Sequence, residues 1–354
     1  MSHVPLFVGL FGERKLHAFD ENEVCCSVHK TAPPVFTRVV KRDERCCEGL
    51  AERPILKIVC SIRNNQRHTG KWWGSREKQP ILALHGWQDN AGSFDTLAPL
   101  LSLYAPVLCI DLPGHGFSSH CPRGQFYYLW WDGLILVRRI VKHYQWDKIT
   151  ILGHSLGGTI GFMYAATFPQ DVEKFICIDI AGPSVRPLQY FAQQTGRAVD
   201  QFLAYENMSE ETVPAYTHDE MLKLMLQAYK GSLTDESCEI MLKRGALPVV
   251  ASDSIDVTDD RFRFSRDSRL KIGFLGFLSL DMTLEYASKI TCEVLNIRGK
   301  AGMQFDPPEN YHIILDRIRQ SAKKLELHEV EGTHFLHLNN PESVCPIIVA
   351  FLKS

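Results

Sequence analysis

Lys148–Gly158 reads KITILGHSLGG, an apolar run that meets a glycine-rich turn at Ser155. Gly153 to Gly157 form the pattern G-x-S-x-G, which places a serine on a sharp turn between a strand and a helix. Small residues on both sides let the backbone fold tightly there. Such a turn exposes the serine Oγ at the carboxyl end of a sheet, where open α/β folds bind their ligands. Ser155 is therefore the candidate nucleophile, and a purely structural tight turn is the alternative.

Short apolar runs recur on both sides of this turn. Runs without polar alternation are typical of strands that are buried on both faces of a parallel sheet, and helical patterns lie between them. A doubly wound α/β fold follows, with a mostly parallel central sheet and helices on both faces. The predicted strands are Ile81–Gly86, Pro106–Gly114, Lys148–Ser155, Lys174–Pro183 and Cys292–Gly299, with the more polar Lys324–Gly332 at an edge; the predicted helices are Phe94–Leu103, Leu129–His143, Gly158–Phe168 and Glu342–Leu352.

One interval interrupts this alternation. Residues 184–288 contain amphipathic helical patterns, and an interval of this length is too long for a loop in a compact domain. We expect a helical cap inserted before the penultimate strand, on a core formed by residues 55–183 and 289–354. Residues 1–54 carry little pattern and are interpreted as an N-terminal extension. The remaining expected elements are strands at Leu56–Ile62 and Lys71–Trp73, and cap helices at Gln189–Asn207, Asp219–Tyr229 and Glu236–Arg244.

Composition excludes several classes of protein. Of the 354 residues, 45% are hydrophobic and 23% charged, which is ordinary for a globular protein with a large core. The net charge of −2 argues against a nucleic-acid partner, because phosphate binding needs a concentrated basic surface. No apolar run approaches the ~18 residues of a transmembrane helix. The 11 cysteines, of which Cys60, Cys109, Cys177 and Cys292 lie in apolar runs, favour a reduced, cytoplasmic protein. A peroxisome or another organelle stays open, as does the oligomeric state.

Partners for Ser155 come from both ends of the chain. The backbone N–H of Leu156 opens the helix after the serine, and that of Trp87 follows the strand Ile81–Leu84, so both can stabilise an oxyanion. The general base is expected late in the chain. His334, in the turn directly after the last strand, is preferred over His337. The segment Asp111–Gly116, with His120 and Cys121 nearby, is interpreted as a turn rather than a metal site.

Four segments together resemble the serine hydrolase-like proteins of the α/β-hydrolase superfamily. They are HGWQDN within His85–Leu101, DLPGHGFSSH (Asp111–His120), GHSLGG, and GTHFLHLNNPE (Gly332–Glu342). The resemblance covers residues from about 70 to 354. It implies an α/β-hydrolase fold with a helical cap, a nucleophilic serine and no cofactor.

The third member of the triad departs from the superfamily pattern. The commonest acid position reads G-x-x-D after the penultimate strand, and here it reads Gly299-Lys300-Ala301-Gly302. Two aspartates remain as candidates. Asp306 follows the same strand after an extended loop and is narrowly preferred. Asp179 lies at the end of a strand, one strand position beyond the strand that carries the nucleophile.

These features predict a serine hydrolase. Ser155 would attack an ester, thioester or related acyl bond of a small-molecule substrate, with His334 as general base. The alternative is a catalytically weak relative that binds a ligand or a partner protein, which the glycine at position 302 favours.

Overall fold

The computed structural model describes residues 67–127, 130–209, 212–249, 260–272, 277–303 and 306–354. Within these residues the centre of the molecule is a sheet of seven strands in the order β1-β3-β2-β4-β5-β8-β9. Only β1 runs antiparallel to its neighbour; every other pair in this sheet is parallel. The strands are β1 (Gly70–Trp73), β2 (Ile81–Leu84), β3 (Val107–Ile110), β4 (Ile149–His154), β5 (Val172–Ile178), β8 (Glu293–Ala301) and β9 (Lys324–Thr333).

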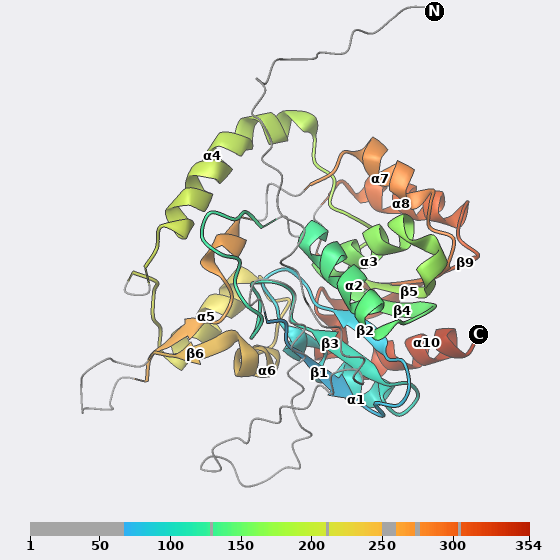
Figure 1. Ribbon diagram of the computed structural model, residues 1–354, viewed down its shortest axis with the longest axis horizontal. Helices are drawn as coiled ribbons and strands as arrows, with labels where there is room; N and C mark the ends of the chain where they lie inside the picture. Colours follow the sequence, from blue (N-terminus) through green and yellow to red (C-terminus); the bar gives the residue numbers. More distant parts are fainter. Residues whose placement is uncertain (1–66, 128–129, 210–211, 250–259, 273–276, 304–305) are drawn as a thin grey trace, which may run out of the picture. The chain divides into compact units, whose positions relative to one another are not determined.

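Helices cover both faces of this sheet, as the alternation of patterns predicts (Figure 1). One apolar layer joins the sheet to α2, α3, α7 and α8, and the other joins it to α1 and α10. The edge strand β9 is the most polar, because one of its sides lacks a neighbouring strand. The helices are α1 (Leu97–Leu101), α2 (Trp130–Tyr144), α3 (Leu156–Thr167), α7 (Leu280–Ala287), α8 (Pro308–Arg319), α9 (Leu336–Asn339) and α10 (Pro341–Lys353), with 3₁₀ turns at Ala91–Phe94, Pro169–Asp171 and Ser268–Lys271.

The cap enters the chain between β5 and β8. It contains α4 (Leu188–Glu206), α5 (His218–Ala228) and α6 (Asp235–Gly245), and it adds a small antiparallel pair, β6 (Ala246–Pro248) with β7 (Phe262–Phe264), which the sequence did not predict. Apolar residues of α5 and α6 form one cluster with Phe335 and Leu338 of the core. Helix α7 packs against α3 and α8 and is therefore part of the packed core. In the sequence it lies within residues 184–288, the interval predicted to form the cap.

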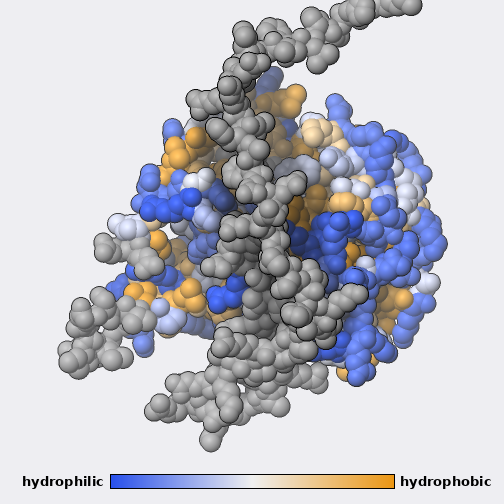
Figure 2. Space-filling view, viewed as in Figure 1, coloured by the Kyte–Doolittle hydropathy of each residue, from blue (hydrophilic) through white to orange (hydrophobic). Residues whose placement is uncertain are grey.

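Helix α4 contributes little to this packing. Only Ala198 and Phe202 of its side chains are buried, and hydrophobic patches alternate with hydrophilic ones in the region of this helix in the space-filling view (Figure 2). The apolar packing of the cap against Phe335 and Leu338 therefore comes from α5, α6 and the β6–β7 pair. The exposed large apolar residues of α4 are Leu188, Tyr190, Val199 and Leu203.

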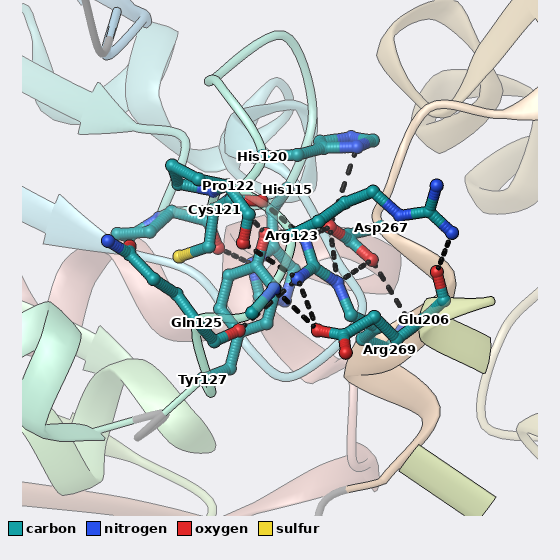
Figure 3. A network of polar contacts seen from close by, with 12 residues as sticks. His115, His120, Cys121, Pro122, Arg123, Gln125, Tyr127, Glu206, Asp267 and Arg269 are labelled. Atoms are coloured by element: carbon teal, nitrogen blue, oxygen red, sulfur yellow. Dashed lines mark hydrogen bonds and ion pairs between the residues drawn. The ribbon is translucent and has the colours of Figure 1, made fainter. Parts of the chain in front are cut away.

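A buried ionic network fixes the cap to the loop that follows β3 (Figure 3). Arg269 pairs with Asp267 at 2.7 Å and donates to the backbone carbonyls of Cys121, Pro122 (3.1 Å) and Gln125 (3.2 Å). Asp267 also accepts a hydrogen bond of 2.9 Å from the Tyr127 hydroxyl. Because the guanidinium and the carboxylate are both satisfied, this buried pair avoids an uncompensated charge.

Three predictions lie wholly outside the described residues. These are the extension 1–54, the strand Leu56–Ile62 and the buried position of Cys60. Among the described cysteines, Cys109, Cys177 and Cys292 are buried and free.

Candidate active site

Ser155 occupies the strained turn that the G-x-S-x-G pattern predicts. Its backbone angles are φ 50° and ψ −117°, between the end of β4 and the first residue of α3. A Cβ on Gly153 would lie 2.3 Å from the Gly157 carbonyl oxygen, and one on Gly157 would lie 1.9 Å from the Leu84 oxygen. Both glycines are therefore required by close backbone approach. The second approach also brings the start of α3 against the end of β2.

The ends of neighbouring parallel strands bring two further groups, Asp179 and His334, to this edge. His154 pairs with Ile178 in the register of β4 and β5, so Ser155 and Asp179 follow adjacent positions. The Ser155 N–H donates to the Ile178 carbonyl at 3.2 Å. His334, just beyond β9, places its Nδ1 atom 2.6 Å from Asp179 Oδ2. A carboxylate only accepts, so Nδ1 carries the proton and Nε2 is left as the basic nitrogen.

Asp179 is held from two sides. Its backbone has φ 61°, and its N–H donates to the Ile297 carbonyl at 2.8 Å. Oδ1 accepts a hydrogen bond of 2.8 Å from the Gly299 N–H, which leaves Oδ2 for His334. A Cβ on Gly302 would lie 2.2 Å from Oδ1. The glycine at position 302 therefore makes room for the carboxylate that projects from β5.

The two candidate acids, Asp306 and Asp179, have different partners in the structure. Asp306 Oδ1 lies 3.7 Å from the Arg186 guanidinium, whereas the Nδ1 atom of His334 faces Asp179. The physical reason is the course of the chain at the end of β8. The turn Gly299–Gly302, closed by a Gly302 N–H to Gly299 carbonyl bond of 2.9 Å, leaves the corner beside His334 to Asp179.

The two backbone amides expected to bind an oxyanion are those of Leu156 and Trp87. Leu156 is the first residue of α3, where amides lack a partner within the helix and the helix dipole favours negative charge. Trp87 lies in the turn after β2, and its indole Nε1 donates to the Leu270 carbonyl of the cap at 2.7 Å. Neither amide donates a hydrogen bond to another described residue.

The contacts of His337 and of the loop after β3 are those of residues that stabilise the fold. The His337 ring is buried, and its centroid lies 5.1 Å from the centroid of the Phe94 ring and 4.2 Å from that of His154. The ring makes no hydrogen bond within the described part of the chain. Burial lowers its pKa well below the ordinary value. Asp111 pairs with the buried Arg244 and accepts a 2.8 Å bond from the Ala91 N–H, so its oxygens are already satisfied.

Asp89 and Tyr229 belong to the same region, and the sequence analysis did not single them out. Asp89 is 1% exposed. Its carboxylate accepts hydrogen bonds from the Gly86 N–H and the Tyr229 hydroxyl, and it lies 3.5 Å from Nδ1 of His154. The motif His85–Asn90 contained the signal, since an aspartate in an otherwise apolar turn needs polar partners when it is buried.

Comparison with known proteins places the chain among hydrolases. A family model described as the alpha/beta hydrolase fold matches residues 79–223. A probable serine hydrolase of Drosophila melanogaster is 52% identical over 80% of this chain and 83% of its own length. A serine hydrolase-like protein of Danio rerio is 34% identical over 80% of this chain and 84% of its own.

Solved structures agree on the fold. A hypothetical protein of Pseudomonas aeruginosa superimposes with a TM-score of 0.69 at 26% identity, covering 82% of this chain and 96% of that one. A thioesterase domain from the curacin biosynthetic pathway gives a TM-score of 0.67 at 19% identity, over 84% and 100% of the two chains. No helix among the described residues is long and apolar enough to cross a membrane.

Proposed function

Since the chain belongs to the serine hydrolase-like proteins of the α/β-hydrolase fold, we propose that it cleaves an ester, thioester or related acyl bond through an acyl-enzyme on Ser155. The observation that carries this proposal is the 2.6 Å contact between His334 Nδ1 and Asp179 Oδ2 at the strand edge where Ser155 lies. Asp179 would then serve as the triad acid, in place of the aspartate that the superfamily pattern has at position 302.

Each side chain then has one role. His334 Nε2 takes the proton from Ser155 Oγ as the oxygen attacks the acyl carbon, and the Leu156 and Trp87 amides stabilise the oxyanion. His334 passes that proton to the leaving alcohol or thiol as the bond to it breaks. Asp179 orients the imidazole and stabilises the imidazolium.

Water completes the cycle by the same route. It loses a proton to His334 Nε2, attacks the acyl carbon, and the acid leaves as the Ser155 oxygen recovers its proton. No external cofactor enters this balance, because every proton that His334 accepts is returned.

A ligand-binding protein without activity is the second candidate, and it rested on the absent acid at position 302. The contact of Asp179 with His334 removes that support. The two functions differ in one measurable property, the reactivity of Ser155.

The test is labelling with a fluorophosphonate, together with hydrolysis of a short p-nitrophenyl ester. We expect the full chain to be labelled and to turn over the ester, and Ser155→Ala to abolish both, since loss of a triad nucleophile costs about 10⁶ in kcat. Ser288→Ala is the matched control, because Ser288 is also half-buried but lies at the end of α7. Equal labelling of the wild type and Ser155→Ala would refute the assignment.

A further inference from the structure

The carboxylate of Asp89 closes the turn that carries Trp87. Its Oδ2 accepts a 3.2 Å hydrogen bond from the Gly86 N–H, and its own N–H donates to the Gly86 carbonyl at 3.2 Å. A Cβ on Gly86 would lie 2.6 Å from the same Oδ2, so the turn and the carboxylate are in direct contact. Trp87 lies between the two residues, and the direction of its amide depends on this closure.

The same oxygen faces the residue before Ser155. Asp89 Oδ2 lies 3.5 Å from Nδ1 of His154, whose ring is fully buried. The other ring nitrogen, Nε2, lies 2.9 Å from the backbone carbonyl of His334. A carbonyl only accepts, so Nε2 carries the proton and the ring holds the His334 backbone in place. Asp89 therefore lies behind the side chain that joins the nucleophile turn to the histidine loop.

A cap residue completes this arrangement. The Tyr229 hydroxyl donates to Asp89 Oδ1 at 3.2 Å, and Tyr229 is the C-terminal capping residue of α5. Its ring also meets the edge of Phe335, with centroids 5.0 Å apart. One carboxylate thus contacts the Trp87 turn, the His154 ring and the cap.

Holding a carboxyl group here opposes folding. Burial raises the pKa of Asp89 to about 6, although His85, His334 and the hydrogen bonds from Tyr229 and Gly86 favour its charged form. Buried groups with perturbed pKa values cluster at functional sites. A role confined to packing would be met at lower cost by an apolar side chain.

We propose that Asp89 is a positioning residue, which holds the Trp87 amide and the His334 backbone in place around Ser155 and ties both to the cap through Tyr229. This inference rests on the proposed serine hydrolase function. It assigns to Asp89 a part in transition-state stabilisation, exerted through Gly86 and His154 and without contact with the substrate.

The test compares Asp89→Ala, Asp89→Asn and Tyr229→Phe with the control Asp95→Ala. Asp95 is a partly buried carboxylate of the same segment, but its partner is Lys71 at 2.5 Å. Each full-length variant is titrated to completion with fluorophosphonate, so that kcat is expressed per reactive Ser155. The thermal midpoint and KM for a p-nitrophenyl ester are measured in parallel.

We expect kcat of Asp89→Ala to fall about 10- to 100-fold with KM within about threefold, because misplacing an oxyanion donor acts on the transition state. Asp89→Asn should fall less, because the amide keeps one acceptor oxygen, and Tyr229→Phe should lose a few fold. Asp95→Ala should change the thermal midpoint but not kcat per reactive serine.

Unchanged kcat per reactive serine in Asp89→Asn and Tyr229→Phe would overturn the inference, even if Asp89→Ala fails to fold. A wild-type chain that fluorophosphonate does not label would instead refute the proposed function. The two failures are therefore distinguishable in one series of measurements.

Discussion

At the level of single residues, the site depends on backbone geometry as much as on side-chain chemistry. Ser155 at φ 50° and Asp179 at φ 61° both adopt a conformation that non-glycine residues rarely take. Each directly follows a strand of the parallel sheet, at β4 and β5. The strain at these two positions points the serine and the carboxylate into the same edge of the sheet.

The role of Asp179 can be measured against that of Asp306. Asp179→Asn should fold and lose about 10³–10⁴ in kcat, because the amide cannot hold the same imidazole tautomer or stabilise the imidazolium. Asp306→Asn is the matched control, since Asp306 contacts Arg186, and it should stay within about threefold of wild-type kcat. The measurement is kcat per reactive serine together with the thermal midpoint. A folded Asp179→Asn variant with less than tenfold loss would contradict the triad.

The sequence singles out Ser155 and His334, whereas between the two aspartates it gives only a narrow preference. Ser155 and His334 lie in local patterns, a G-x-S-x-G turn and a turn after the last strand. Such patterns can be recognised from a few neighbouring residues. The choice of acid depends on which carboxylate fills a corner formed by β5, β8 and the His334 loop. That is a contact between residues 155 positions apart, which no local spacing encodes.

At the level of elements, the end of β8 and the end of β5 share one site. The turn Gly299–Gly302 provides an amide for Asp179 Oδ1 and, at position 302, provides space. The apolar runs predicted five strands of the sheet and their parallel order, because burial on both faces leaves a continuous hydrophobic pattern. The β6–β7 pair escaped prediction because three-residue strands are too short to show a period.

Gly302→Ala tests the shared site. The added Cβ would lie 2.2 Å from Asp179 Oδ1, so the carboxylate must move away from its place beside His334. We expect kcat to fall by about tenfold or more, since misplacements near 1 Å can cost 10²-fold. The control is Gly196→Ala on α4, where an added Cβ meets nothing within 4 Å.

The converse experiment moves the acid between the two strands. Asp179→Ala should be nearly inactive, and Asp179→Ala combined with Gly302→Asp should recover part of the lost kcat, because the new carboxylate starts from the space that Asp179 vacates. Wild-type kcat in Gly302→Ala would show that the carboxylate tolerates displacement and would weaken the assignment of Asp179.

At the level of the whole molecule, a set of buried neutral histidines surrounds the site. His85 Nε2 accepts a 3.0 Å bond from the Leu112 N–H, and His115 Nε2 accepts a 3.1 Å bond from the Gln88 N–H. Both rings must be neutral to accept. Burial lowers the pKa of His85, of His115 to about 3, and of His154 and His337 well below the ordinary value.

This set makes folding sensitive to mild acid. In the unfolded chain each histidine binds a proton near pH 6.5, whereas in the folded protein it stays neutral. The unfolded state therefore binds more protons, and the free energy of unfolding falls as the pH drops below about 6.5. Each such histidine costs about 1.4 kcal/mol between pH 7.5 and 5.5. Asp89 acts in the opposite direction, because its raised pKa lets the folded state take up a proton near pH 6.

His337→Phe isolates one member of this set. Its ring has aromatic neighbours in Phe94 and Phe335 and no hydrogen bond within the described residues, so phenylalanine fits its chemistry. We expect the loss of unfolding free energy between pH 7.5 and 5.5, measured by urea denaturation, to shrink by about 1.4 kcal/mol relative to wild type. His312→Gln is the control, because His312 is exposed on α8 and should leave the loss unchanged. If His337→Phe keeps the full wild-type loss, His337 is protonated in the folded protein at pH 5.5. A charged imidazolium would then lie beside the aromatic rings of Phe94 and Phe335. That outcome would conflict with the burial of His337 without a hydrogen-bond partner among the described residues.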